Sequence, residues 1–143
     1  MRGQIREGVK NFYEDYWENR KEIDHLYEEW ETKRLQIKSA ILEAQGCDTI
    51  LDVGCGEGTL GKLAPDECSM YGVDISETAL EMADKHYVAT AQADIEDDNI
   101  VEIFDANFDA VVCLEVLEHL FHPHAVLEKL SDDLDSGTTV IAS

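Results

Sequence analysis

Apolar residues recur at helical spacing along the first third of the chain. The first series consists of Ile5, Val9, Phe12 and Tyr16. The second series consists of Ile23, Leu26, Trp30, Ile37 and Ile41. Residues three and four apart share one face of a helix, and the charged residues between them occupy the other face. Gly46 follows the second series where a helix C-cap glycine is expected. Residues 1–46 are therefore predicted to form an N-terminal helical segment.

From Thr49 onward, short apolar runs alternate with helical stretches. The predicted strands are residues 49–53, 69–73, 87–91, 108–114 and 138–142. The predicted helices are residues 59–63, 76–85 and 123–134, with Ser76 as an N-cap and Pro123 in a first turn. This alternation predicts an α/β fold, a parallel sheet with helices on both faces. Right-handed crossovers and one reversal after the third strand give a Rossmann-like strand order of 3-2-1-4-5.

The predicted core domain covers residues 47–143 and reaches the last residue just after its fifth strand. A fifth strand in that position leaves an exposed sheet edge. We expect a partner chain or a second copy to cover this edge, unless the sequence is truncated relative to a longer fold with further C-terminal strands.

Composition and charge narrow the classes of partner. The 143 residues carry a net charge of −21, which repels phosphate backbones and anionic membrane surfaces and disfavours a nucleic acid substrate. No apolar stretch approaches the ~18 residues that span a bilayer. The first ten residues lack the apolar core of a secretory signal. We therefore expect a cytoplasmic protein.

Residues 50–58, with the sequence ILDVGCGEG, form a glycine-rich turn between a predicted strand and a predicted helix. Glycine lets the backbone turn sharply and approach a ligand, and the helix start supplies free N–H donors. Asp74 follows at the end of the second strand, 74 − 52 = 22 residues after Asp52. A carboxylate at that spacing accepts hydrogen bonds from both hydroxyls of a ribose. The pattern favours a ligand that contains a nucleoside, the alternative being a tight turn that binds nothing.

Two other nucleotide sites agree less well with these residues. A phosphate-binding P-loop needs Ser or Thr for magnesium where Leu63 stands. A dinucleotide site prefers Gly or Ala at the position of Thr59, and no carboxylate at Asp52 near the pyrophosphate. Asp52 and Glu57 instead suit a ligand that carries positive charge.

Residues 51–58 (LDVGCGEG) closely resemble the first motif of class I S-adenosylmethionine-dependent methyltransferases. Residues 71–76 (YGVDIS), 93–95 (ADI) and 108–120 (FDAVVCLEVLEHL) are similar to the second, third and fourth motifs. The resemblance implies that S-adenosylmethionine is the cofactor and that a small-molecule acceptor is methylated, as in ubiquinone-biosynthesis O-methyltransferases. It places Asp74 on the ribose, Ile75 against adenine and Asp94 at the adenine amino group. The full set of implied cofactor-binding residues in the core is Asp52, Gly54, Cys55, Gly56, Asp74, Ile75, Asp94, Ile95 and Leu114.

A segment rich in Glu and His follows the fourth motif. Glu115, Glu118, His119 and His122 are spaced to share one helix face. Three interpretations stay open: a divalent metal site, similar to that of small-RNA 2′-O-methyltransferases; an active-site mouth with His119 as general base; and local packing. We predict His119 as the catalytic residue and assign no metal ligand.

Aromatic residues gather ahead of the core domain. Phe12 and Tyr16 are expected to pack their helix onto the sheet. Tyr13 and Trp17 are predicted to close over the cofactor, as aromatic residues of N-terminal helices do in similar methyltransferases. The competing functions are a cofactor-binding subunit or fragment without catalysis and, with less support, an NAD-dependent oxidoreductase.

Overall fold

The computed structural model describes residues 5–20, 32, 35–36, 38, 42–43 and 45–143. The second apolar series of the N-terminal segment lies outside the described residues. No helix among the described residues is long and apolar enough to cross a membrane.

Five strands form one parallel sheet at the centre of the core domain. They are β1 (Thr49–Val53), β2 (Ser69–Asp74), β3 (Ala89–Gln92), β4 (Ala110–Cys113) and β5 (Thr139–Ala142). Their order is β3-β2-β1-β4-β5, and every adjacent pair is parallel. The Rossmann-like order predicted from the sequence is therefore confirmed. In the part of the chain that the structure describes, β5 forms one sheet edge, and a partner chain on it stays a prediction.

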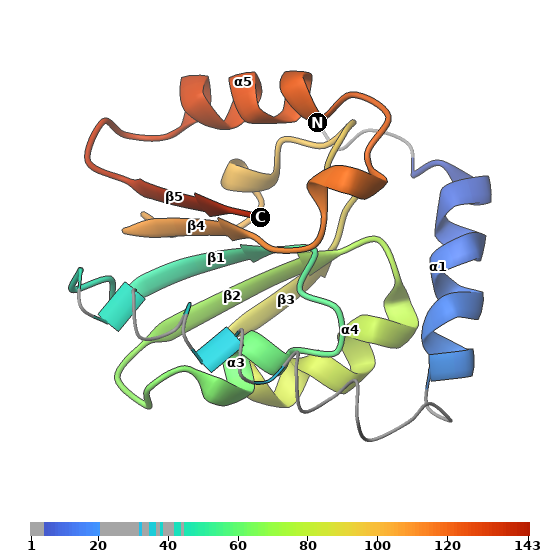
Figure 1. The fold of residues 1–143 in the computed structure, drawn as a ribbon, viewed down its shortest axis with the longest axis horizontal. Coiled ribbons are helices and arrows are strands. Elements are labelled where there is room, and N and C mark those ends of the chain that lie inside the picture. The colour runs from blue at the N-terminus through green and yellow to red at the C-terminus, as the bar shows by residue number, and fades with distance from the viewer. Residues whose placement is uncertain (1–4, 21–31, 33–34, 37, 39–41, 44) are drawn as a thin grey trace.

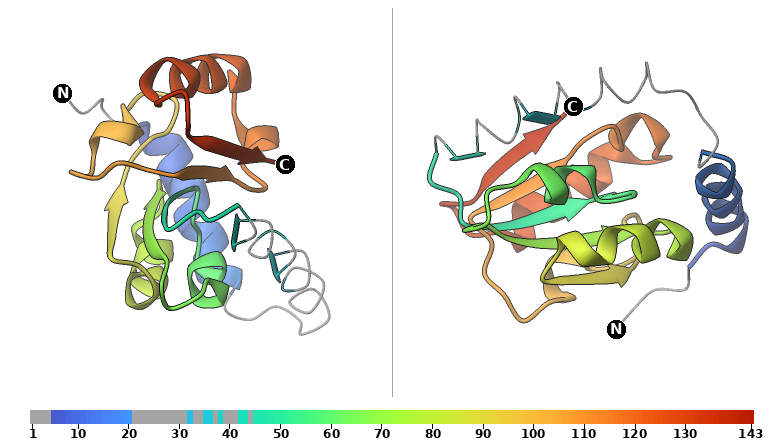
Figure 2. Two further views of the ribbon diagram at one scale, coloured as in Figure 1. Left: turned by 90° about the vertical axis from the view of Figure 1, so that its left-hand side faces the viewer. Right: turned by 90° about the horizontal axis from the view of Figure 1, so that it is seen from below.

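The helices enclose the sheet on both faces and at one end (Figures 1 and 2). α3 (Thr59–Leu63) and α4 (Glu77–Ala83) lie on one face, and α5 (Pro123–Asp133) lies on the other. α1 (Glu7–Arg20) stands across the carboxyl ends of the strands. Single turns of 3-10 helix occur at Asp84–His86, Ile100–Glu102 and Leu117–His119. The sheet thus leaves its carboxyl end facing α1.

Alternation along the strands divides the apolar residues between two cores. Leu51 and Val53 of β1 point toward α5, where they pack in one cluster with Val126. Ile50 points to the opposite face and packs in a second cluster with Leu60 of α3. Burial of apolar surface on both faces of the sheet, which contributes about 25 cal/mol per Å², drives this arrangement.

Local signals set the helix boundaries. Ser76 caps α4, because its hydroxyl accepts a hydrogen bond from the N–H of Ala79 at 3.1 Å. Gly46 has a φ of 67°, and the N–H groups of Gly46 and Cys47 donate to the carbonyls of Glu43 and Leu42. These two bonds form the helix-terminating arrangement predicted from the glycine.

The packing predicted for two aromatic residues of α1 is wrong. Phe12 is 64% exposed and Tyr16 is 44% exposed. The cause is the position of α1, which crosses the strand ends and does not lie on a sheet face. All four rings border the cavity beneath α1, but the half-buried ones are Tyr13 and Trp17, one position along the helix from the expected stripe.

Gly61 gives a direct test of the packing under α3. A Cβ added there would lie 2.7 Å from the ring of Tyr87 and 2.9 Å from the carbonyl oxygen of His86. We expect Gly61→Ala to lower the free energy of unfolding by about 1–3 kcal/mol, as overpacking does. Helix propensity alone predicts the opposite sign, a gain of up to ~1 kcal/mol. Urea unfolding followed by circular dichroism measures the difference.

Gly8→Ala is the matched control, because Gly8 is also helical and a Cβ there meets nothing within 4 Å. This variant is expected to be as stable as the wild type or slightly more so. Equal stability of Gly61→Ala and the wild type would contradict the packing described here.

Candidate functional site

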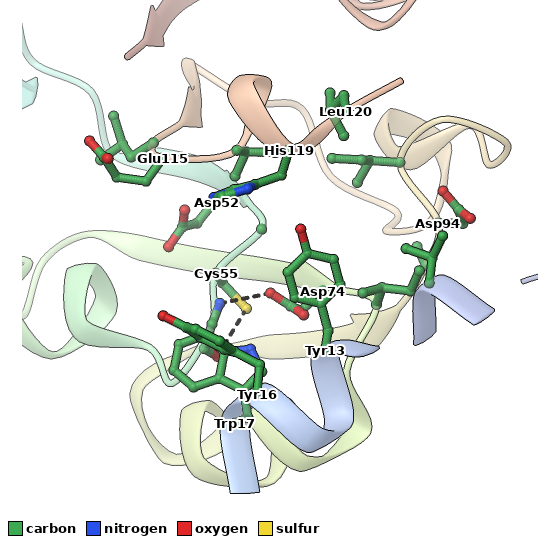
Figure 3. A pocket seen from close by; sticks show the side chains of 18 of the residues that line it. Tyr13, Tyr16, Trp17, Asp52, Cys55, Asp74, Asp94, Glu115, His119 and Leu120 are labelled. Atoms are coloured by element: carbon green, nitrogen blue, oxygen red, sulfur yellow. Dashed lines mark hydrogen bonds between the residues drawn. The ribbon is translucent and has the colours of Figure 1, made fainter. Parts of the chain in front are cut away.

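A cavity of about 1140 Å³ lies between α1 and the carboxyl ends of the strands (Figure 3). Its position is where the strand order reverses between β1 and β4, the point at which open α/β sheets bind ligands. Every site residue predicted from the sequence lines this cavity. From the core these are Asp52, Gly54, Cys55, Gly56, Asp74, Ile75, Asp94, Ile95, Leu114 and His119, and from α1 they are Tyr13 and Trp17.

The glycine turn after β1 needs glycine for two physical reasons. Gly56 has a φ of 53°, in the left-handed region that favours glycine. A Cβ there would also lie 2.6 Å from the ring of Trp17. The turn is tied to β2, since the N–H groups of Gly54 and Cys55 both donate to the carbonyl of Val73. Backbone and cavity therefore meet here without an intervening side chain.

Asp74 ends β2 and is fixed by two backbone donors. The N–H of Gly56 donates to its Oδ2 at 2.9 Å, and the N–H of Ser76 donates to its Oδ1 at 2.9 Å. Burial raises the pKa of Asp74, and these two N–H groups oppose the shift. Each carboxylate oxygen has two lone-pair directions, so both keep capacity to accept a further hydrogen bond from a ligand.

Asp52 of β1 is more deeply buried than Asp74. Its side chain is 4% exposed, and burial raises its pKa to about 7, against a hydrogen bond from Tyr87 that lowers it. A cation in the cavity would favour the ionised form. The charge of Asp52 therefore depends on whether a cation occupies the cavity.

Asp94 follows β3 and pairs with α1. Its carboxylate is 1% exposed and receives two hydrogen bonds from Arg6, at 2.6 Å from Nε and 2.9 Å from Nη2. The hydrogen bond with Asp94 raises the pKa of Arg6. Arg6 also contacts Glu96 at 2.8 Å, and Glu96 accepts the N–H of His122 at the start of α5. One cation thus joins α1, the loop after β3 and the entry to α5.

A second polar contact holds the middle of α1. Glu14 accepts hydrogen bonds from the N–H of Glu77, the N–H of Thr78 and the hydroxyl of Ser76, at 2.7–3.1 Å. Partial burial acts to raise the pKa of Glu14, but these hydrogen bonds outweigh it and lower the pKa. Glu14 thereby caps α4 from another helix. Between the contacts of Arg6 and Glu14, α1 turns Tyr13 toward the cavity (Figure 3).

The helix face predicted for the Glu and His segment is wrong. Glu115 has a φ of 56°, Leu117–His119 is a single 3-10 turn, and His122 precedes the start of α5. The change from β4 to α5 takes a loop here, so the four side chains do not share one helical surface. No group of three His, Cys, Asp or Glu side chains placed to hold a metal ion occurs among the described residues.

His119 nevertheless reaches the cavity from this turn. Its ring lies edge to face with Tyr13, with centroids 6.3 Å apart, and its Nε2 is 3.8 Å from Oε1 of Glu118. The side chain is 55% exposed, which leaves it open to a reactant in the cavity.

Apolar side chains complete the region around Asp74 and Asp94. Ile75 and Ile95 are half-buried in the cavity wall, and Leu114 is buried beside the end of β4. The amide of Gln92 donates to the carbonyl of Ile75 at 2.9 Å, which fixes the loop after β2. This apolar surface between two carboxylates is suited to a flat, partly polar ring.

Comparison with known proteins identifies the family. Residues 51–140 match the family described as "Methyltransferase domain". The chain belongs to this family of methyltransferases. The match runs from within β1 to within β5 and includes the glycine turn and all the core site residues. It confirms the resemblance to class I S-adenosylmethionine-dependent methyltransferases.

Relatives and solved structures agree with this assignment. The ubiquinone biosynthesis O-methyltransferase of Dechloromonas aromatica is 35% identical over 99 residues, covering 66% of this chain and 43% of the relative. That of Nitrosomonas europaea is 29% identical over 133 residues, covering 90% and 56%. Magnesium protoporphyrin IX methyltransferase from Synechocystis PCC 6803, solved with bound S-adenosylmethionine, has a TM-score of 0.71 at 20% identity, covering 93% and 73%. The last similarity shows the fold. The methyltransferase chain spans about half the length of the curated relatives it matches.

Three residues that hydrogen-bond to the predicted site residues or to the start of α4 were not predicted from the sequence. Arg6, Glu14 and Tyr87 act on Asp94, on the start of α4 and on Asp52 through contacts that span 88, 62–64 and 35 residues. No local motif marks such pairs. The sequence contains 11 Lys and Arg residues against 32 Asp and Glu residues. This imbalance was the one feature of the sequence to indicate that a cation beside a buried carboxylate would be important for the site.

Loss of the Arg6 contact is expected to loosen α1. Arg6→Ala leaves the buried Asp94 carboxylate without its bidentate partner, a loss of about 1–2 kcal/mol for a pair with one partly exposed member. Hydrogen exchange of the amides of residues 7–20 should therefore speed up about tenfold. Lys10→Ala removes a charge of the same sign from α1, four residues after Arg6, and is expected to leave the exchange unchanged. Unchanged exchange in Arg6→Ala would show that other contacts hold α1.

Proposed function

We propose that this chain binds S-adenosylmethionine in the cavity and transfers its methyl group to a small-molecule acceptor. The observation that carries the proposal is the placement of a glycine turn, Asp74 and Asp94 at three successive strand ends around one cavity. Residues 47–143 would form the cofactor-binding core and residues 1–46 the lid segment.

The charges of the cavity fit this cofactor. Its inner wall carries the carboxylates of Asp52, Asp74 and Asp94, and Arg6 already pairs with the last of them. An anionic pyrophosphate is repelled by such a wall, whereas a sulfonium and an ammonium group are attracted. The net charge of −21 extends the same preference to the surface and supports a small acceptor over a nucleic acid.

The adenosine part would lie toward β2 and β3. Asp74 has free acceptor capacity for ribose hydroxyls, because its present donors are backbone N–H groups on the side of the protein. Ile75, Ile95 and Leu114 would surround the adenine ring, and Asp94 would accept from its amino group. Arg6 contacts both oxygens of Asp94, so adenine and α1 would share this carboxylate.

The methionine part would lie toward the glycine turn. Gly54, Cys55 and Gly56 present backbone to the cavity, and Asp52 faces it from β1. Trp17 covers Gly56 from α1, so closing of the helix would exclude water from this end. The cofactor, when bound, supplies an electrophilic methyl group on its sulfonium, and the task of the chain is to orient the two reactants.

The acceptor side would be formed by α1 and the turn after β4. The cavity volume exceeds the ~300–1,000 Å³ of typical small-molecule sites, which leaves room for a second ligand. Tyr13, Phe121 and His119 line that side. His119 would take the proton from a hydroxyl acceptor, a role suited to an imidazole near neutral pH. The O-methyltransferase relatives support oxygen as the methylated atom.

Calorimetric titration tests the cofactor site. We expect micromolar binding of S-adenosylmethionine and S-adenosylhomocysteine and none of NAD. Asp74→Ala removes the ribose acceptor, and two lost hydrogen bonds to a charged group are worth roughly 3 kcal/mol, or a hundredfold in Kd.

Asp109→Ala is the matched control. Asp109 also accepts two backbone N–H groups, from Asp48 and Thr49, but it lies at the opposite end of the strands. Its loss should leave cofactor affinity unchanged. Equal affinity losses in both variants would indicate general destabilisation, and no binding by the folded wild type would overturn the proposal.

Methyl transfer tests the role of His119. With a panel of phenols and catechols as acceptors, His119→Ala should lower kcat about a hundredfold or more, with cofactor affinity retained. His124→Ala changes an exposed histidine of α5 and should have no effect. Full activity of His119→Ala would exclude it as the base. Cofactor binding without transfer to any acceptor would favour a binding subunit without catalysis.

A further inference from the structure

The ring of Tyr87 lies beneath the glycine turn, where three glycines leave it space. A Cβ added at Gly58, Gly61 or Gly72 would come within 3.0, 2.7 and 3.2 Å of this ring, respectively. The ring also packs on the cluster of Cys55, Leu80 and Ala83. Tyr87 follows the 3-10 turn after α4 and is not one of the residues that line the cavity. This packing fixes the ring in one place.

The hydroxyl of Tyr87 joins the backbone of α3 to Asp52. It accepts a hydrogen bond from the N–H of Gly61 at 3.2 Å and donates one to Oδ2 of Asp52 at 2.6 Å. The bond from Gly61 uses an acceptor lone pair, so the single proton of the hydroxyl is directed to Asp52. Burial and the nearby Asp52 charge raise the pKa of Tyr87, which keeps the hydroxyl protonated as a donor.

Among the described residues near Asp52, Tyr87 supplies the hydrogen bond that favours the charged form of the carboxyl. The titratable groups that face it are Asp74 of β2, Cys55 of the glycine turn, Cys113 of β4, Tyr87, and Glu115 and His119 across the cavity. Burial and Asp74 disfavour an ionised Asp52, and the Tyr87 hydrogen bond opposes them. Among the described residues, the Tyr87 hydroxyl is thus the side-chain donor that favours the ionised form of this buried carboxyl.

We propose that Tyr87 is a positioning residue, which keeps Asp52 ionised and aimed at the positive charge of the cofactor. This inference rests on the proposed function, because it needs a cationic ligand in the cavity. It adds a residue that lies outside the cavity wall and that contacts no ligand. Its effect reaches the ligand through the Asp52 carboxylate alone.

The proposal predicts a particular pH dependence. A carboxyl with a raised pKa is neutral below that pKa and charged above it, so affinity for a cation should rise with pH through about 7. Removal of the Tyr87 hydroxyl shifts the pKa of Asp52 further up. The affinity of the variant for the cation should then rise with pH over a higher pH range than that of the wild type. In alkaline solution the Kd values of the two proteins should become equal.

The experiment is calorimetric titration of the wild type and Tyr87→Phe from pH 6 to 9. Phenylalanine keeps the ring between the glycines and removes only the hydroxyl. For a shift of one pKa unit from about 7, we expect Kd for S-adenosylmethionine to rise about fivefold at pH 7, where the wild-type carboxyl is only half ionised. The ratio of the two Kd values should approach about ten at pH 6 and fall toward one at pH 9. The ratio of the two Kd values cancels any titration of the ligand itself.

Two controls separate this effect from damage to the turn. Methylthioadenosine keeps the adenosine and sulfur but carries no positive charge, so Tyr87→Phe should change its Kd less than twofold. The ring of Tyr71 in β2 packs on Phe104 and Phe108 in the other core. Tyr71→Phe removes its hydroxyl and should leave the Kd values of both ligands unchanged.

The outcomes are distinct. A wild type that binds neither ligand refutes the proposed function, whatever the variant does. A wild type that binds S-adenosylmethionine, with an unchanged Kd in Tyr87→Phe at pH 7, overturns the role of Tyr87. Equal losses for both ligands at all pH values also overturn it, since they indicate a structural role only.

Discussion

Buried carboxylates at the carboxyl end of the sheet are the constraint on which the site depends. Asp52, Asp74 and Asp94 are all under 10% exposed, and each needs donors to offset the loss of water. Three different solutions are present: backbone N–H groups for Asp74, the Tyr87 hydroxyl for Asp52, and the Arg6 guanidinium for Asp94. The glycine turn, the position of α1 and the packing of Tyr87 all follow from these requirements.

These donors leave part of the negative charge of the cavity carboxylates without a positive partner in the described residues. Backbone N–H groups and a neutral hydroxyl stabilise an anion without cancelling its charge, and among the described residues the cationic partner in this set is Arg6, which pairs with Asp94. A ligand that carries a sulfonium and an ammonium would complete the balance. The same carboxylates would repel phosphates, so the chemistry that costs stability in the free protein would also separate one nucleoside ligand from another.

The N-terminal segment around α1 contacts two carboxyl ends of the sheet through Arg6 and Glu14. Arg6 binds the carboxylate proposed for adenine, and Glu14 caps the helix that follows the carboxylate proposed for ribose. A ligand that uses Asp94 changes the environment of Arg6, so binding and helix position are linked through one ion pair. Trp17 over Gly56 extends this link to the glycine turn.

The sequence by itself determined the sheet and the core of the site. Strand order, the cap at Ser76 and the residues of the glycine turn depend on short-range patterns: alternation, glycine spacing and a carboxylate after a strand. Other features needed the tertiary structure. The side of α1 that faces inward depends on where the helix docks, so the helical spacing of Phe12 and Tyr16 led to a wrong prediction of their burial. The loop at Glu115 replaced a helix because β4 and α5 must be joined across the sheet end. The partners of Asp52 and Asp94 come from residues 35 and 88 positions away, and hydrogen bonds of that span leave no periodic trace in the chain.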